Sequence, residues 1–348
     1  MNRYPRWVAA LAIASLTTGC SLIGSGEPES GARTVTLVAH DSFAADPAAL
    51  ADFERRSGIH LEVRNSGDAG ELTNKLALSQ AAPLGDVAYG VDSTFASRAL
   101  SADVFEPYRP DAADRGPQRY AQDQQHRLTA VDVADVCLNV DTRWFAEHRV
   151  PEPATLRDLT DPRYRDLVAL PDPTTSSPGL AFLLGTIATF GEPGWQDYWR
   201  QLTANGAKLS SGWEEAYNQD FSGSTGQGPR PIVLSYASSP AAEVDEAGRP
   251  RTRALLDGCY RQVEYAGVLT GAKDPEAARE VVDFLLSPEF QGQVAEQMYV
   301  YPAVEGIALP PGWETSAPLP PRPTELPAAE VERNRDRWVD EWRTLIRG

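Results

Sequence analysis

Four aromatic residues lie where the chain could present ring faces to a ligand. Trp213 and Tyr236 follow small residues at expected strand-to-loop junctions, and Tyr299 and Tyr301 stand close together further along. A ring over a desolvated cation contributes about 2 kcal/mol. The alternative is that Trp213 and Tyr236 are half-buried packing residues. From the residue types alone, both interpretations stay open.

Acidic side chains could supply the counter-charge. The candidates are Asp41, Asp68, Asp92, Asp135, Glu214 and Glu215. Because the chain holds 49 Asp and Glu residues, any one of them is usually a solvated surface group or a helix cap. Asp135 differs, because it stands among apolar neighbours and is costly to bury without a partner. That partner is a cationic ligand, an arginine or a backbone N–H.

Hydroxyl groups gather at residues 174–179 (TTSSPG), where Ser177 is expected to cap a helix that starts at Pro178. Helix starts favour anions and polar oxygens. Thr175, Ser176 and Ser177 are therefore candidates to bind a hydroxyl or phosphate group of a ligand, although simple helix capping fits the same residues.

His40 ends the first expected strand, where its imidazole could stack, hydrogen-bond or simply lie in a loop. The chain has only four histidines and no Cys/His cluster, so no zinc site is predicted. It also lacks a phosphate-cradling GxxxxGK[ST] loop and a GxSxG nucleophile turn.

Alternating strands and helices must position these residues. Strands are expected at 34–39, 59–64, 86–91, 131–140, 168–170, 231–236 and 262–269. Helices are expected at 46–58, 71–80 and 93–100, after Pro178 and Pro240, and from the Asp-Pro and Ser-Pro pairs at 274–275 and 287–288. A last amphipathic helix carries Val331, Trp338, Trp342 and Leu345. The alternation predicts α/β lobes with mainly parallel strands.

The length of 348 residues usually exceeds one core and predicts two lobes. We expect residues 34–130 and 266–348 to form the first lobe and residues 131–265 the second. In such folds ligands bind at the carboxyl ends of strands, where the loops of the two lobes meet.

The N-terminus is typical of a targeting segment. Arg3 and Arg6 precede an apolar run at 7–16, which is shorter than the roughly 20 residues that span a bilayer. The sequence LTTGC at 16–20 resembles a bacterial lipobox. We therefore expect residues 1–20 to be a signal peptide, Cys20 to carry a lipid, and residues 21–33 to be a flexible tether.

The formal net charge of −17 argues against binding to nucleic acid or to anionic membrane surfaces, and it permits a cationic ligand. Two cysteines remain beyond Cys20. Cys137 and Cys259 each lie in a strand-like run, where they either form a disulfide or stay as buried thiols.

Several loops carry motifs in a fixed order. They are HDSFAAD at 40–46, DPTTSSPGL at 172–180, GWEEAY at 212–217, LSYASSP at 234–240, YPAV at 301–304 and LPPGW at 309–313. Over roughly residues 34–345, their order and spacing resemble the thiamine-binding proteins of ABC importers.

The resemblance implies a type II periplasmic-binding-protein fold, in which two α/β lobes joined by a hinge enclose thiamine. It implies a monomer outside the cytoplasm that delivers thiamine or a thiamine phosphate to permease subunits, without enzymatic activity, metal or cofactor. The matching positions are Asp41, Ser42, Ser176, Ser177, Trp213, Tyr217, Tyr236, Ser238 and Tyr301. His40, Asp68, Asp92, Asp135, Thr175 and Tyr299 complete the predicted ligand-binding set.

The chain departs from the family pattern at four places. His40 stands where the family commonly has Tyr, Pro47 and Tyr299 stand where it commonly has Trp, and residues 132–135 (DVAD) replace a Tyr-rich stretch. Compared with the family pattern, this chain has less aromatic surface for stacking and more acidic groups.

Three other interpretations fit parts of the sequence. Cys137 beside Asp135 is the one arrangement that could suggest a thiaminase-like enzyme. A site for ferric ion or another small cation is the second, although Tyr299 and Tyr301 are not adjacent. The third is a surface adaptor lipoprotein that binds no ligand.

Overall fold

The computed structural model describes residues 33–225 and 227–347. The predicted signal peptide, the predicted lipidation site Cys20 and nearly all of the predicted tether lie outside these residues. Within the described part, the strands form one hydrogen-bonded sheet in the order β2-β1-β3-β8-β4-β7-β5-β6, and β9 pairs with β4. No helix in this part is both long enough and apolar enough to cross a membrane.

The first group of strands is parallel and follows the prediction closely. β1 (Arg33–Ala39) pairs in parallel with β2 (Ile59–Asn65) and with β3 (Val87–Asp92). The intervening helices are α1 (Pro47–Ser57), α2 (Ala69–Leu78) and α3 (Ala96–Ser101). α1 begins as expected, because Asp46 accepts the N–H of Ala48, and it ends at Gly58 with φ of 69°.

The second group of strands is also parallel. β5 (Val168–Pro171) pairs with β6 (Lys208–Ser210) and with β7 (Ile232–Tyr236). Its helices are α4 (Thr142–His148), α5 (Ser177–Phe190), α6 (Gly194–Ala204) and α7 (Trp213–Glu215). α5 begins one residue earlier than predicted, with Ser176 rather than Ser177 at the cap position.

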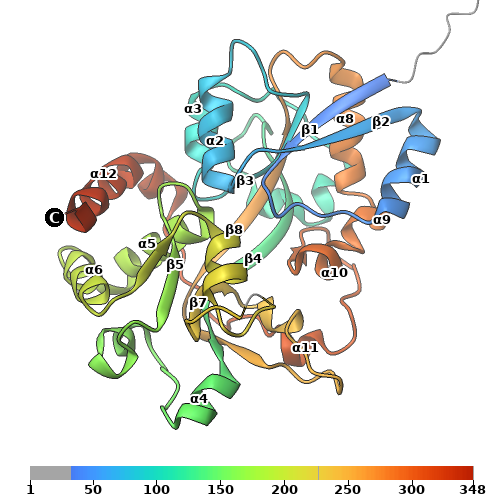
Figure 1. Ribbon diagram of the computed structural model, residues 1–348. Helices are drawn as coiled ribbons and strands as arrows, with labels where there is room; N and C mark the ends of the chain where they lie inside the picture. The colour runs from blue at the N-terminus through green and yellow to red at the C-terminus, as the bar shows by residue number, and fades with distance from the viewer. Residues whose placement is uncertain (1–32, 226, 348) are drawn as a thin grey trace, which may run out of the picture. The chain divides into compact units, whose positions relative to one another are not determined.

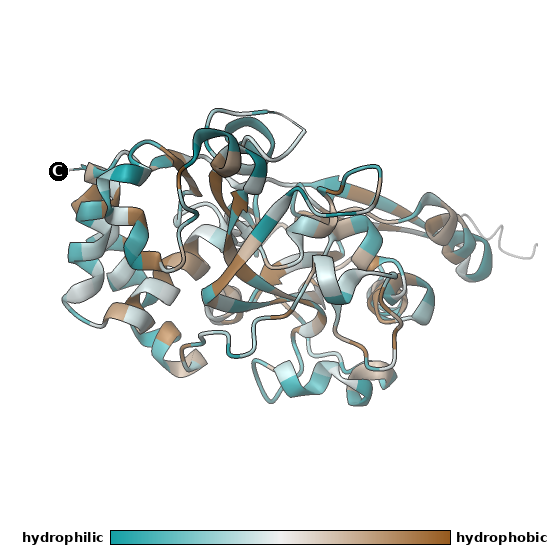
Figure 2. Ribbon diagram, turned by 90° about the horizontal axis from the view of Figure 1, so that it is seen from below, coloured by the Kyte–Doolittle hydropathy of each residue, from teal (hydrophilic) through white to brown (hydrophobic). Residues whose placement is uncertain are grey.

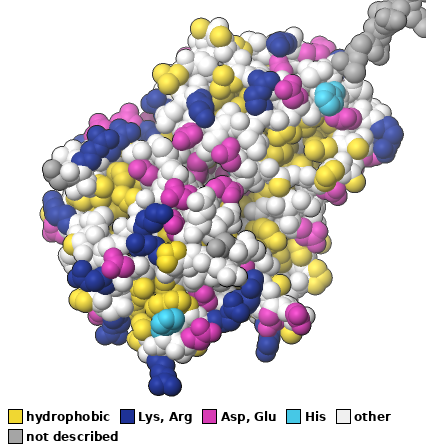
Figure 3. Space-filling view, viewed as in Figure 1, with side chains coloured by type: hydrophobic (Ala, Val, Ile, Leu, Met, Phe, Trp, Pro, Cys, Tyr) yellow, Lys and Arg dark blue, Asp and Glu magenta, His cyan; other side chains and the backbone are white. Residues whose placement is uncertain are grey.

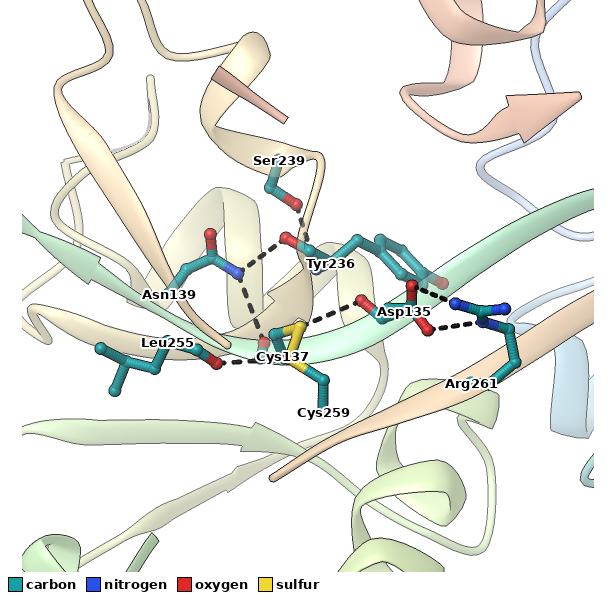
Figure 4. Close-up of a disulfide and its surroundings, with 8 residues drawn as sticks. All are labelled: Asp135, Cys137, Asn139, Tyr236, Ser239, Leu255, Cys259 and Arg261. Atoms are coloured by element: carbon teal, nitrogen blue, oxygen red, sulfur yellow. Dashed lines mark hydrogen bonds and ion pairs between the residues drawn. A yellow bond between two sulfur atoms is a disulfide. The ribbon is translucent and has the colours of Figure 1, made fainter. Parts of the chain in front are cut away.

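Two long antiparallel strands join these groups (Figure 1). They are β4 (Thr129–Asp141) and β8 (Thr252–Val268). β8 begins ten residues before the predicted strand. Its first half includes Asp257 and Gly258, residue types that usually mark a turn. Cys137 on β4 and Cys259 on β8 form a disulfide (Figure 4), which answers the question that the sequence left open.

The remaining helices follow β8 or connect strands. After β8 come α8 (Pro275–Leu285), α9 (Pro288–Gln291), α10 (Val294–Met298), β9 (Tyr301–Pro302), α11 (Trp313–Ser316) and α12 (Ala328–Arg347). Short 3-10 helices lie at Asp111–Arg115, Pro117–Tyr120, Leu156–Thr160, Pro162–Tyr164 and Ser239–Ala241, and a π-helical turn lies at Ala216–Asp220. The helix predicted after Pro240 is thus only one such short turn.

Apolar side chains pack into separate cores along the sheet. Strands β1 and β3 pack with α1, α8 and α9, and strands β4, β5 and β7 pack with α5, α6 and α12. Figure 2 shows the apolar residues concentrated on the inner strands. The predicted amphipathic face of α12 is confirmed, because Val331, Trp338 and Trp342 are buried. α12 contacts both α3 and α6.

Candidate ligand-binding site

A cavity of about 300 Å³ opens where the ends of strands from both groups meet, within the size range of small-molecule sites. Its wall is formed by His40, Ser42, Asp68, Ser177, Pro178, Trp213, Tyr217, Asn218, Thr225, Tyr236, Ser239, Ala242, Glu243, Glu264, Met298, Tyr299 and Val300. Eight of the predicted ligand residues are therefore brought together: His40, Ser42, Asp68, Ser177, Trp213, Tyr217, Tyr236 and Tyr299.

The aromatic part of the wall is a fixed stack. The rings of Trp213 and Tyr217 lie 4.9 Å apart between centroids and are tilted by only 14°. The ring of Tyr236 lies 6.2 Å from that of Trp213. Trp213 donates its indole N–H to Ser235 Oγ at 2.9 Å, and Tyr217 donates its hydroxyl to Glu243 at 3.3 Å. These bonds hold the rings in one orientation, so their faces are preorganised for a flat ligand.

Asp68 joins the two groups of strands at the cavity wall. It precedes α2, and its carboxylate accepts the backbone N–H of Ser177 at 3.2 Å and that of Trp213 at 2.9 Å. These N–H groups belong to the first turns of α5 and α7, which would otherwise leave them unpaired. Burial raises the pKa of Asp68 above its usual value, and the two N–H donors offset only part of that increase.

A second acidic group of the wall is paired with a histidine. His40 Nε2 lies 3.1 Å from Glu264 Oε2, and both side chains are about nine-tenths buried. Burial opposes protonation of His40, but Glu264, Asp68 and Asp132 together raise its pKa to about 9. Burial likewise opposes ionisation of Glu264, but His40 lowers its pKa overall.

Tyr89 and Asp132 lie directly behind this pair. The Tyr89 hydroxyl is within hydrogen-bonding distance of both Asp132 and Glu264. Burial and the charge of Glu264 raise the pKa of Asp132 well above its usual range. The cluster therefore places two carboxyl groups and one imidazole in a small buried volume next to the cavity.

Asp135 takes a structural partner instead of the predicted ligand. Its side chain is fully buried, and both carboxylate oxygens accept bonds from Arg261, at 2.7 and 3.0 Å (Figure 4). This is the arginine alternative that the sequence allowed. Since Arg261 already neutralises the carboxylate, and Asp135 does not line the cavity, the structure leaves it no ligand role.

Six further predicted residues also lie outside the cavity wall: Asp41, Asp92, Thr175, Ser176, Ser238 and Tyr301. Most of them support neighbouring backbone. Asp41 accepts the N–H of Gly67 at 2.8 Å, Thr175 donates its hydroxyl to Ser211 O at 2.7 Å, and Ser238 donates to Tyr299 O. The ring of Tyr301 packs edge-on against Trp313.

The sequence interpretation missed Glu264 and Glu243, as well as neutral wall residues such as Asn218, Thr225 and Met298. A signal for Glu264 was present. Glu264 lies between apolar neighbours in a strand, and the same pattern made Asp135 a candidate. The neutral residues carry no comparable signal, because neither a charge nor unusual neighbours along the sequence mark them.

The structure bears on two of the alternatives. Cys137 has no free thiol, because it is bonded to Cys259, which removes the nucleophile of a thiaminase-like enzyme. Among residues 33–225 and 227–347, no group of three or more His, Cys, Asp or Glu side chains could hold a metal ion. Of the two tyrosines weighed for iron, only Tyr299 lines the cavity. Figure 3 shows acidic and basic side chains mixed over one face, as for a solvated surface.

The fold and the enclosed cavity define a protein that binds a small solute. Residues 82–321 match the family model described as a bacterial extracellular solute-binding protein, and the chain belongs to this family. It is an extracytoplasmic binding protein and not an enzyme, as the sequence predicted.

Individual relatives are consistent with this assignment. The chain is 28% identical to the thiamine-binding periplasmic protein of Brucella suis biovar 1 over 335 residues, which covers 92% of this chain and 95% of that protein. It is 29% identical to the Escherichia coli K12 protein of the same name over 328 residues, covering 90% and 93%. A solved structure titled periplasmic thiamin binding protein superposes with a TM-score of 0.80 at 27% identity, covering 90% of this chain and 96% of that one. The predicted periplasmic-binding-protein fold is thus confirmed.

Proposed function

We propose that this protein captures thiamine, or a thiamine phosphate, and delivers it to the permease subunits of an ABC importer. The observation that carries the proposal is the composition of the cavity wall, which combines stacked aromatic rings with buried acidic groups. Thiamine has a permanently cationic thiazolium, a flat aminopyrimidine and a hydroxyethyl tail, so it needs ring faces, counter-charge and polar contacts. The names of the relatives support the same ligand.

Each part of the wall suits one part of the ligand. The faces of Trp213, Tyr236 and Tyr299 would stack on the two rings, with about 2 kcal/mol for each cation–π contact that excludes water. Ser177, at the start of α5, lines the cavity, and its hydroxyl would donate to an oxygen of the tail. Asp68 and Glu264 would supply the counter-charge.

We further propose that residues 34–130 and 266–348 move as one lobe and residues 131–265 as the other, with β4 and β8 as the hinge. Ser42 donates to Glu214 at 2.8 Å, and Asp68 accepts from Ser177 and Trp213, so contacts between the two proposed lobes converge at the cavity. Ligand would shift the population toward this closed arrangement. α12 belongs to the first proposed lobe by its place in the sequence, but its apolar face packs in the core of the second lobe and the helix also contacts α3, so it would link the two lobes.

We also propose that a lipid on Cys20 anchors the protein to the outer face of the cytoplasmic membrane, with residues 21–33 as the tether. The support is the LTTGC sequence behind a short apolar run. Growth with labelled palmitate should label the wild-type chain and not Cys20→Ala. Equal labelling of both chains would reject the anchor.

The ligand itself is tested by mass spectrometry of the small molecules released from gently purified protein. Thiamine or one of its phosphates should appear in stoichiometric amount. A different solute in that amount, with no thiamine species, would reject the proposal. Trp213→Ala purified in parallel is the matched control and should retain less ligand.

A further inference from the structure

A protonated His40 paired with Glu264 would place a cation in the wall of a cavity that we propose to hold a cationic ligand. Both residues line the cavity, and Nε2 of the imidazole lies 3.1 Å from Glu264 Oε2. A protonated imidazole there repels a positively charged ligand ring and already neutralises the nearest carboxylate. The ligand and the proton therefore compete for the same partner.

The contact of the other ring nitrogen of His40, Nδ1, favours a neutral imidazole. The backbone N–H of Ser42 donates to His40 Nδ1 at 3.2 Å, which requires a lone pair on Nδ1. A neutral imidazole with its proton on Nε2 satisfies both the Ser42 and the Glu264 contact. An imidazolium carries a proton on both nitrogens and loses the Ser42 contact.

The surroundings of His40 favour the extra proton as long as no ligand is present. Glu264 faces it from β8, Asp132 from β4, and Asp68 from the start of α2. Tyr89 on β3 packs against the imidazole at 5.5 Å between ring centroids and bonds to both carboxyl groups behind it. A second cation near Glu264 would remove much of this preference.

We propose that Glu264 is the acidic group that recognises the cationic ring of the ligand, and that His40 gives up a proton to solvent when the ligand binds. The inference rests on the proposed function, because it requires a permanently cationic ligand. His40 is then a specificity-determining residue, since only a positively charged ligand can replace its proton.

The same exchange links charge recognition to closure. Neutral His40 holds the backbone of Ser42, and the Ser42 hydroxyl donates to Glu214 at 2.8 Å, on α7 of the other proposed lobe. Loss of the proton therefore favours the position of Ser42 from which it reaches Glu214. A cationic ligand would stabilise the closed arrangement at a point that it need not touch.

The test is calorimetric titration of the protein without its predicted signal peptide (residues 1–20) with thiamine at pH 7.5, in buffers of different ionisation enthalpy. We expect release of up to one proton per ligand, and an association constant that rises with pH from 6 to 9 by at most tenfold per unit. His40→Gln, which keeps a donor toward Glu264 but does not titrate, should bind without proton release. Glu264→Gln should bind thiamine at least tenfold more weakly, with unchanged circular dichroism.

An uncharged thiophene analogue of thiamine is the matched ligand control and should bind the wild-type protein with no proton release. Thiamine binding without proton release, or equal release in His40→Gln, would overturn the inference and leave the proposed function standing. Absence of thiamine binding in every buffer would reject both.

Discussion

The carboxylate of Asp68 accepts the backbone N–H of Trp213 at 2.9 Å, although the two residues are 145 positions apart. The contact ties the start of α2 to the aromatic stack of the cavity. With Ser177 as a second donor, one side chain holds together three of the segments that form the wall.

Replacement of Asp68 should therefore weaken ligand binding without unfolding the protein. In Asp68→Asn one oxygen acceptor becomes an NH₂ group that faces a backbone N–H, and we expect a loss of about 1.5–3 kcal/mol in binding free energy. Asp41→Asn is the control, because Asp41 bonds to Gly67 outside the cavity wall. Calorimetry that found equal losses in both variants would contradict this role.

Truncation of the aromatic wall should have an effect of similar size. Trp213→Ala and Tyr236→Ala are each expected to weaken thiamine binding by roughly 1–3 kcal/mol, the scale of stacking plus cation–π contact. Trp144 is the control. It stacks on His148 at 4.0 Å and does not line the cavity, so Trp144→Ala should leave the affinity unchanged. Wild-type affinity in both cavity variants would rule out this placement of the ligand.

The fully buried Asp92 should make stability depend on pH. Burial raises its pKa to about 7, against about 3.9 in an unfolded chain. Between pH 4 and pH 7 the unfolded chain releases a proton that the folded protein keeps, so this carboxyl group lowers the free energy of unfolding as the pH rises. Urea unfolding should show a shallower decline over this range in Asp92→Asn than in wild type. Parallel curves for the two proteins would contradict the assignment.

Loss of the disulfide should destabilise the fold. Cys137 and Cys259 are 122 positions apart, and removal of a native disulfide typically costs about 2–5 kcal/mol. The Cys137→Ser, Cys259→Ser double variant should unfold at lower urea concentration than oxidised wild type, and a reductant should shift only the wild type. A reductant-insensitive midpoint in wild type would argue that the bond does not form.

The sequence predicted the local elements well, because their signals are local. Asp46, Pro47 and Gly58 mark the start and end of α1, and the first three strands follow the expected boundaries closely. The length of β8 was missed, since its first half gains its strand conformation by pairing with β4, a contact far away along the chain. Tertiary pairing decided this element, as it often does for strands.

The candidate site was predictable to the extent that motifs mark strand ends. The segments after β1 and β6 did supply His40 and Trp213, and the last residue of β7 supplied Tyr236. The partner of a buried acid could not be read from the sequence. Asp135 and Glu264 have the same kind of apolar neighbours, yet Arg261 pairs with the first and His40 with the second.

Titration of the signal-free protein with thiamine tests the central claim most directly. The account predicts saturable binding of one thiamine per chain at pH 8, markedly weakened in Trp213→Ala and retained in Trp144→Ala. Absence of heat with freshly refolded, ligand-free wild-type protein, or identical curves for the two tryptophan variants, would contradict it.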